Sequence, residues 1–175
     1  MRTHIQFVVF GLVLAFLAAS PASSTQVADV KAGLVCDPGN NGWICIQTED
    51  IHLTGQGRCV FNKQEMPCTW YGFSFQYWDN KPGTQLVCNY KAALPWTMGN
   101  PTQVIEEQTT EGTYSLPLEG THGRFYNPQY RIYGLRDRGT PIDSISTRCS
   151  IDGKEVANFR FNIITGEVPE SRRDF

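Results

Sequence analysis

The sequence predicts an all-β protein, an antiparallel β-sandwich or small barrel of about seven to nine strands that is stabilised by disulfides. Several segments alternate between apolar and polar residues, as half-buried strands do. Turn-forming residues recur about every eight to twelve positions, and no segment has a convincing helical pattern. Six cysteines supply the expected cross-links.

Residues 67–92 carry the clearest pair of strands. Their inward rows are Tyr71, Phe73, Phe75 and Tyr77, then Leu86, Cys88, Tyr90 and Ala92. Because Pro82 and Gly83 form a turn between these rows, we expect a hairpin that sets Phe75 opposite Tyr90. The residues expected in the core are Phe73, Phe75, Tyr77, Leu86, Tyr90, Phe159 and Phe161.

The remaining segments are placed by the same pattern. We expect strands at 43–53, 58–61, 66–78, 103–106, 113–116 and 129–133, with a short helix at 102–109 as the alternative for that region. At the end of the domain, residues 144–151 and 157–163 alternate on either side of Asp152-Gly153, which is a strong hairpin signal. Residues 23–34 and 168–175 are expected to be loosely ordered.

The N-terminus predicts export. Arg2 precedes a continuous apolar run, Phe7 to Ala19, and small residues follow it, so residues 1–22 are typical of a signal peptide cleaved after Ala22. The run is too short for a membrane-spanning helix, and no second run follows, so we expect no transmembrane anchor. Residues 23–175 would then form a single secreted or periplasmic β domain.

The charge balance argues against nucleic acid as a partner. Removal of Arg2 with the leader leaves 14 basic residues against 17 acidic ones, a formal charge of −3. Non-specific binding to nucleic acid needs a basic surface, which this balance does not favour.

All six cysteines lie after the leader, as a disulfide framework in an exported protein requires. Spacing favours the pairs Cys36–Cys45 and Cys59–Cys68, because each encloses eight residues that suit a hairpin. Elimination then pairs Cys88 with Cys149. The short Cys-x2-Cys spacing of a metal site is missing, so no metal site is predicted.

Residues suited to catalysis are few. His52 and His122 are the histidines that remain after the leader, and each is more easily explained as a surface or packing residue. The sequence has no nucleophile elbow, zinc-protease motif, P-loop or Rossmann glycine pattern. We therefore predict no catalytic residue and no cofactor, with a small secreted hydrolase built from distant residues as the alternative.

Two tryptophans indicate a binding surface. Trp70 and Trp78 lie on the strand face opposite to the aromatic row, with small or polar residues between them. They would stand about 26 Å apart at about 3.3 Å per residue, which is too far for one small ligand. The sequence therefore predicts a binding module (an inhibitor, an adhesin-like subunit or an envelope accessory protein) that contacts a protein or an extended polymer such as a polysaccharide. The alternative is that both rings lie under loops or beneath the long segment 93–121.

Overall fold

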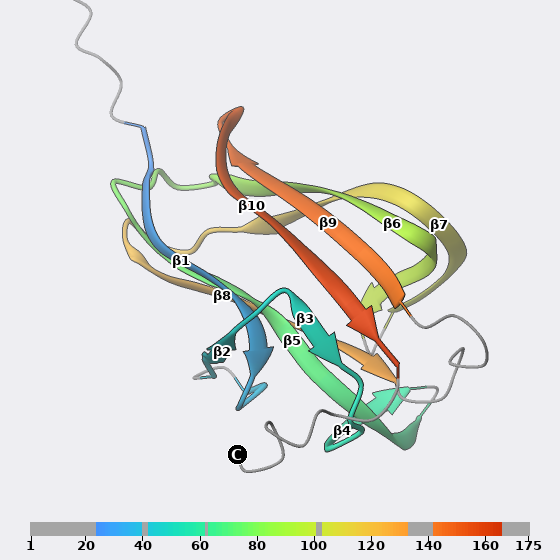
Figure 1. Ribbon diagram of the computed structural model, residues 1–175. Helices are drawn as coiled ribbons and strands as arrows, with labels where there is room; N and C mark the ends of the chain where they lie inside the picture. The colour runs from blue at the N-terminus through green and yellow to red at the C-terminus, as the bar shows by residue number, and fades with distance from the viewer. Residues whose placement is uncertain (1–23, 40–41, 62, 101–102, 133–141, 166–175) are drawn as a thin grey trace, which may run out of the picture.

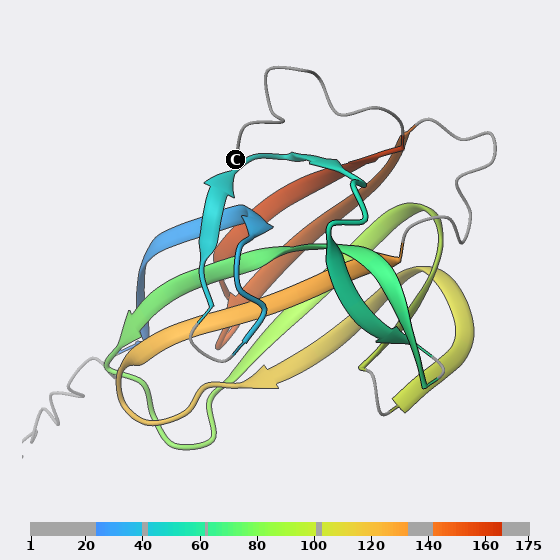
Figure 2. The same cartoon turned by 90° about the horizontal axis from the view of Figure 1, so that it is seen from below.

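The structure, a computed structural model, describes residues 24–39, 42–61, 63–100, 103–132 and 142–165. These residues form ten strands in two five-stranded sheets and contain no helix. The sheets stack as two layers (Figure 1, Figure 2), which confirms the β-sandwich and excludes the small barrel. The expected signal peptide and the tail at 168–175 lie outside the described residues.

The first sheet is built around its longest strand. Its members are β1 (Gln26–Val35), β2 (Ile44–Gln47), β4 (Gly57–Phe61), β5 (Gln64–Trp78) and β8 (Gly123–Ile132). Both β1 and β8 pair antiparallel with β5 over residues 71–77. Since one edge of a strand accepts one neighbour, β1 and β8 lie on opposite edges of β5.

The second sheet has the order β3-β10-β9-β6-β7. These strands are β3 (Asp50–His52), β6 (Gln85–Asn100), β7 (Gln103–Pro117), β9 (Ile142–Ile151) and β10 (Lys154–Ile164). The short β3 runs parallel to β10, whereas the other pairs in this sheet are antiparallel. The sheet is therefore antiparallel, as expected, except at this edge.

The predicted C-terminal hairpin is confirmed. Asp152 and Gly153 connect β9 to β10, with Ile151 paired to Lys154. Their φ angles are 50° and 78°, the left-handed pair that a tight hairpin turn requires.

The hairpin predicted for residues 67–92 is wrong. Strand β5 belongs to the first sheet and β6 to the second, so Phe75 and Tyr90 are not cross-strand partners. The predicted inward rows are nevertheless buried, and Phe75, Leu86 and Cys88 belong to the same core cluster between the sheets. An alternating pattern predicts which face of a strand is buried. The pattern is the same whether the two strands are neighbours in one sheet or lie in two sheets that face each other.

The connection at residues 79–84 carries the chain from one sheet to the other. Asp79 and Gly83 adopt positive φ angles of 58° and 83°. The buried Asn80 donates its side-chain amide to the carbonyls of Leu118 (3.3 Å) and Gly120 (2.8 Å). These bonds hold the connection against the segment that joins β7 to β8, which crosses between the sheets beside it.

Residues 23–34 were expected to be loosely ordered, and for residues 26–34 this is wrong. They form most of β1, which lies between β2 and β5. Its pattern is hard to recognise because a small residue, Ala32, packs against the core and the pairing shifts between Ala28 and Lys31. The single strand expected at 43–53 is also divided, into β2 and β3, because the chain changes sheets at residues 48–49.

Two further segments are longer than predicted. The strands expected at 103–106 and 113–116 are one strand, β7, which also rules out the alternative helix at 102–109. Strand β8 begins at Gly123, although we expected a start at residue 129 after Pro128. Proline lacks a backbone donor, and its place in β8 is compatible with a strand that has no described partner on its second edge.

The core consists of two adjoining clusters of aromatic and aliphatic side chains. Six of the seven predicted core residues are buried, and Phe159 is half-buried between the clusters. Ring pairs connect the two sheets: the centroids are 4.7 Å apart for Phe73 and Phe159, and 5.1 Å for Tyr71 and Phe161.

Tyrosine ionisation should report on this core. Burial raises the pKa of Tyr114 from 10.0 to about 12 and raises the pKa of Tyr71 as well. The fold favours the neutral phenol, so its contribution to stability is complete below about pH 10 and is lost as the pH rises through the folded-state pKa. We expect a late phase of tyrosinate absorbance in the folded chain, reduced by Tyr114→Phe. A single phase near pH 10 in the folded and the denatured chain would contradict this.

Candidate functional site

The outer face of the first sheet gathers aromatic and basic side chains. From Tyr71 to Tyr77 the odd-numbered residues of β5 point into the core, so the even-numbered residues of this part point outward. The register sets Tyr130 beside Trp70, Tyr126 beside Ser74 and Arg124 beside Gln76. Strand β8 thus extends the face that the sequence analysis assigned to Trp70 and Trp78.

The disulfide-closed loop between Cys36 and Cys45 crosses this face. Arg124 donates from Nη2 to the Gly42 carbonyl (2.7 Å), and the Tyr126 hydroxyl donates to the Asp37 carbonyl (2.6 Å). The loop follows β1 on one edge of β5 and bonds to β8 on the other, so it passes over β5 (Figure 2). Ser74 is 7% exposed although it lies on an outward-facing row, as expected for a residue beneath a crossing loop.

The loop fits closely against β8. A Cβ atom on Gly42 would lie 1.7 Å from the Asp37 carbonyl oxygen and 2.5 Å from the Tyr126 hydroxyl. The Gly39 amide donates to the Asp37 carboxylate at 2.8 Å, which tightens the first turn. The Arg124 guanidinium also lies 5.5 Å from the centre of the Tyr126 ring.

The hydroxyl of Tyr126 is a neutral donor at ordinary pH. Burial, and then the negative charge of Asp37, raise the pKa of Tyr126, and the positive charge of Arg124 acts in the opposite direction. The hydroxyl therefore keeps its proton and its bond to the loop.

The two predicted tryptophans have different surroundings. The ring of Trp70 is half-buried, with its centroid 4.9 Å from that of Tyr130, and a Cβ atom on Gly57 would lie 2.7 Å from its Cδ1. Trp78 is 40% exposed. The loop crosses β5 between them, so the two rings do not form one continuous row.

Sequence reasoning missed a third tryptophan. Trp43 follows Gly42 in the loop and is 51% exposed. Arg124 bonds to the carbonyl of Gly42, the residue before Trp43. Arg124 also lies beside Gln76, which is two residues before Trp78 on β5. We call Trp43, Trp78, Arg124 and Tyr126 the Arg124 face. A tryptophan within a turn-rich segment between two cysteines was the available signal.

The structure pairs the cysteines as Cys36–Cys45, Cys59–Cys68 and Cys88–Cys149, which are the pairs that spacing and elimination favoured. The last bridge joins neighbouring strands β6 and β9 of one sheet. Three disulfides are consistent with an extracellular or periplasmic location.

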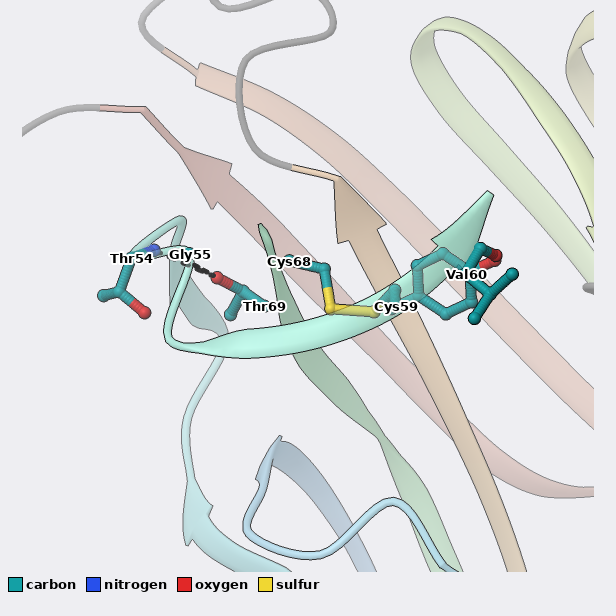
Figure 3. Close-up of a disulfide and its surroundings, with 7 residues drawn as sticks. Thr54, Gly55, Cys59, Val60, Cys68 and Thr69 are labelled. Carbon is teal, nitrogen blue, oxygen red and sulfur yellow. Dashed lines mark hydrogen bonds between the residues drawn. A yellow bond between two sulfur atoms is a disulfide. The ribbon is translucent and has the colours of Figure 1, made fainter. Parts of the chain in front are cut away.

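The Cys59–Cys68 bridge supports the half-buried end of the face. It joins β4 to the first part of β5 (Figure 3). Next to it, the Thr69 hydroxyl accepts hydrogen bonds from the amides of Thr54 (2.9 Å) and Gly55 (3.3 Å), which fixes the chain just before β4. The Tyr130 hydroxyl donates to the Val60 carbonyl at 3.2 Å.

The two histidines are placed apart in the topology. His52 lies in β3 at one edge of the second sheet, and His122 lies immediately before β8. Within the described ranges, no group of three or more His, Cys, Asp or Glu side chains is arranged to hold a metal ion. The same part of the chain has no helix with the length and apolar character needed to cross a membrane.

Comparison with known proteins gives one partial likeness. A 5'-nucleotidase of Vibrio vulnificus (strain CMCP6) is 34% identical over 83 residues, which are 46% of this chain and 15% of that protein. The match therefore covers less than half of this chain and a small part of that relative. No protein-family model matches the chain, and no solved structure matches it.

Proposed function

We propose that this chain is an exported binding module that docks a protein partner on the Arg124 face. The observation that carries the proposal is the exposure of Trp43 (51%) and Trp78 (40%) beside a cation and a tyrosine. Exposed tryptophans are an aggregation risk for a secreted domain unless a partner covers them. Inhibitors, adhesin-like subunits and envelope accessory proteins are the classes that fit such a module.

The chemistry of the face favours a protein over a polysaccharide. Trp, Tyr and Arg are the residue types enriched at the centres of protein–protein interfaces. A polysaccharide would use an uninterrupted track of rings along β5, and the loop between Trp70 and Trp78 divides that track. In this proposal Trp78 contacts the partner, and Trp70 supports the face from its contact with Tyr130.

Export is the second part of the proposal. Three disulfides need an oxidising compartment to form and persist, and the predicted leader at residues 1–22 would take the chain there.

A small secreted hydrolase remains the second candidate. It is favoured by the likeness to part of the Vibrio 5'-nucleotidase. Release of phosphate from a panel of nucleoside monophosphates by the purified chain would support it, provided that a variant of His52 or His122 abolishes the release.

Substitution of Trp43 and Trp78, the two tryptophans of the Arg124 face, should weaken binding without affecting the fold. A photo-crosslinking amino acid at position 76, where the exposed Gln76 lies beside Arg124, first identifies the protein that contacts the face in the cell envelope. Titration with that purified protein then measures Kd. Each of Trp43→Ser and Trp78→Ser should raise Kd about 30-fold, the factor that corresponds to a hot spot of about 2 kcal/mol.

Val60→Ser is the matched control. Val60 is an apolar residue of β4 that is 49% exposed and is not one of the four residues of the Arg124 face, so loss of its side chain should leave Kd unchanged. The bond from Tyr130 goes to the Val60 carbonyl, which the variant keeps. Equal affinity of the double tryptophan variant and the wild type for the partner would contradict the proposal. If the chain instead binds glycans and the same substitutions abolish that binding, the partner is a polysaccharide and not a protein.

A further inference from the structure

The three disulfides differ in their access to solvent. Cys36 and Cys45 are both exposed, whereas the other four cysteines, Cys59, Cys68, Cys88 and Cys149, are buried. Thiol–disulfide exchange requires a thiolate to approach a sulfur atom directly, so access determines which bridge reacts in the folded state. An external thiol can reach the Cys36–Cys45 bridge while the sandwich remains closed.

The exposed bridge also closes the loop that lies on the Arg124 face. The loop is hydrogen-bonded to β8 by Arg124, which donates to the Gly42 carbonyl, and by Tyr126, which donates to the Asp37 carbonyl. Hydrogen bonds near solvent contribute little net stability, because water replaces them when they break. The bridge restricts the conformations of the loop, so its loss favours states in which the loop has left β8.

We propose that Cys36–Cys45 is a site of thiol–disulfide exchange, which a dithiol reductant opens in the folded protein, and that opening releases the loop from β8. The first thiolate of the reductant bonds to Sγ of one cysteine, the S–S bond breaks, and the other cysteine leaves as a thiolate. The second thiol of the reductant loses its proton and attacks the mixed disulfide, which frees the first cysteine. The protein gains two electrons and two protons, and the reductant becomes a disulfide.

Opening has a consequence for the Arg124 face. Trp43 belongs to the loop, whereas Arg124 and Tyr126 belong to β8. Reduction therefore separates Trp43 from the rest of the face and uncovers the outer row of β5 around Ser74. Only this effect on binding rests on the proposed function, because the exchange reaction itself depends on the access to the bridge.

The test is stepwise reduction of the full chain with dithiothreitol in native buffer, followed by alkylation and peptide mass mapping. We expect a range of reductant in which Cys36 and Cys45 are alkylated and the other four cysteines are not. In that range the far-ultraviolet circular dichroism should be unchanged, and hydrogen exchange at the amides of Cys36 and Gly42, which are bonded within the loop, should accelerate. Simultaneous opening of all bridges, prior opening of Cys59–Cys68, or unchanged exchange in the loop would overturn the proposal.

A double variant, Cys36→Ser with Cys45→Ser, provides the control. Its loop amides should exchange at the rate of the reduced wild type, and dithiothreitol in the same range should change nothing. If the variant does not fold, the alkylation pattern of the wild type still decides the outcome. Selective reduction with unchanged binding of the identified partner would contradict the proposed function and leave the exchange site intact, whereas unselective reduction would contradict the exchange site alone.

Discussion

Phe75→Ala should destabilise the domain by about 3–5 kcal/mol, which is a large share of the stability of a typical domain. Phe75 is 1% exposed, and its ring centroid lies 4.9 Å from that of Phe125 and 6.3 Å from that of Tyr77. The substitution leaves a cavity between the sheets, because neighbouring strands can close it only in part. Urea denaturation measures the loss as a lower midpoint with an unchanged slope.

Gln76→Ala is the control for this experiment. Gln76 is the exposed neighbour on the same strand, so the substitution should change the free energy of unfolding by less than about 0.5 kcal/mol. A Phe75→Ala variant that is fully soluble and melts as the wild type does would show that the two faces of β5 are assigned in reverse.

Removal of the Cys88–Cys149 bridge, with both cysteines replaced by alanine, should cost about 4 kcal/mol. The bridge closes a loop with a sequence separation of 61, and both residues are buried in the core next to Leu86 and Ile151. Most of the effect arises in the unfolded chain, which gains conformational freedom when the long loop is released. Denaturation of the oxidised variant and the wild type under identical conditions gives the difference.

The matched comparison is Cys36→Ala with Cys45→Ala. Its sequence separation is 9, for which the same relation gives about 3 kcal/mol, and its residues are exposed. The long bridge should therefore be the more costly to remove. A larger loss of stability on removal of the short bridge would show that strain, or residual structure in the unfolded chain, has a greater effect than the entropy of loop closure.

Alternation along the chain predicted which side chains are buried but not which strands are neighbours. The inward rows of β5 and β6 are in the core, as expected, yet they belong to different sheets. The 79–84 connection carries the chain from one sheet to the other, and there Asn80 bonds to the carbonyls of Leu118 and Gly120, which are distant in the sequence. These contacts span 38 and 40 residues and leave no local pattern in the sequence.

The candidate site was predictable only in part for the same reason. The outward direction of Trp70 and Trp78 follows from the period of a strand. That Trp43 lies on the same face depends on the bond from Arg124 to Gly42, which joins residues 82 apart in the sequence. A turn-rich loop can adopt many conformations, and its contacts with the neighbouring strands select one of them.

The passage of the chain from β5 directly into the opposite sheet should slow the folding of this protein. No hairpin joins these two long strands. Strand β5 pairs instead with β1, which precedes it in the chain, and with β8, which follows it. Strand β6 pairs with β7 and with β9. Folds dominated by such distant pairings form on the scale of milliseconds to seconds, because long loops must close before any contact is gained. In an oxidising compartment the Cys36–Cys45 and Cys59–Cys68 bridges can close as soon as their hairpins meet. The Cys88–Cys149 bridge needs β9 in place beside β6, so we expect it to form last.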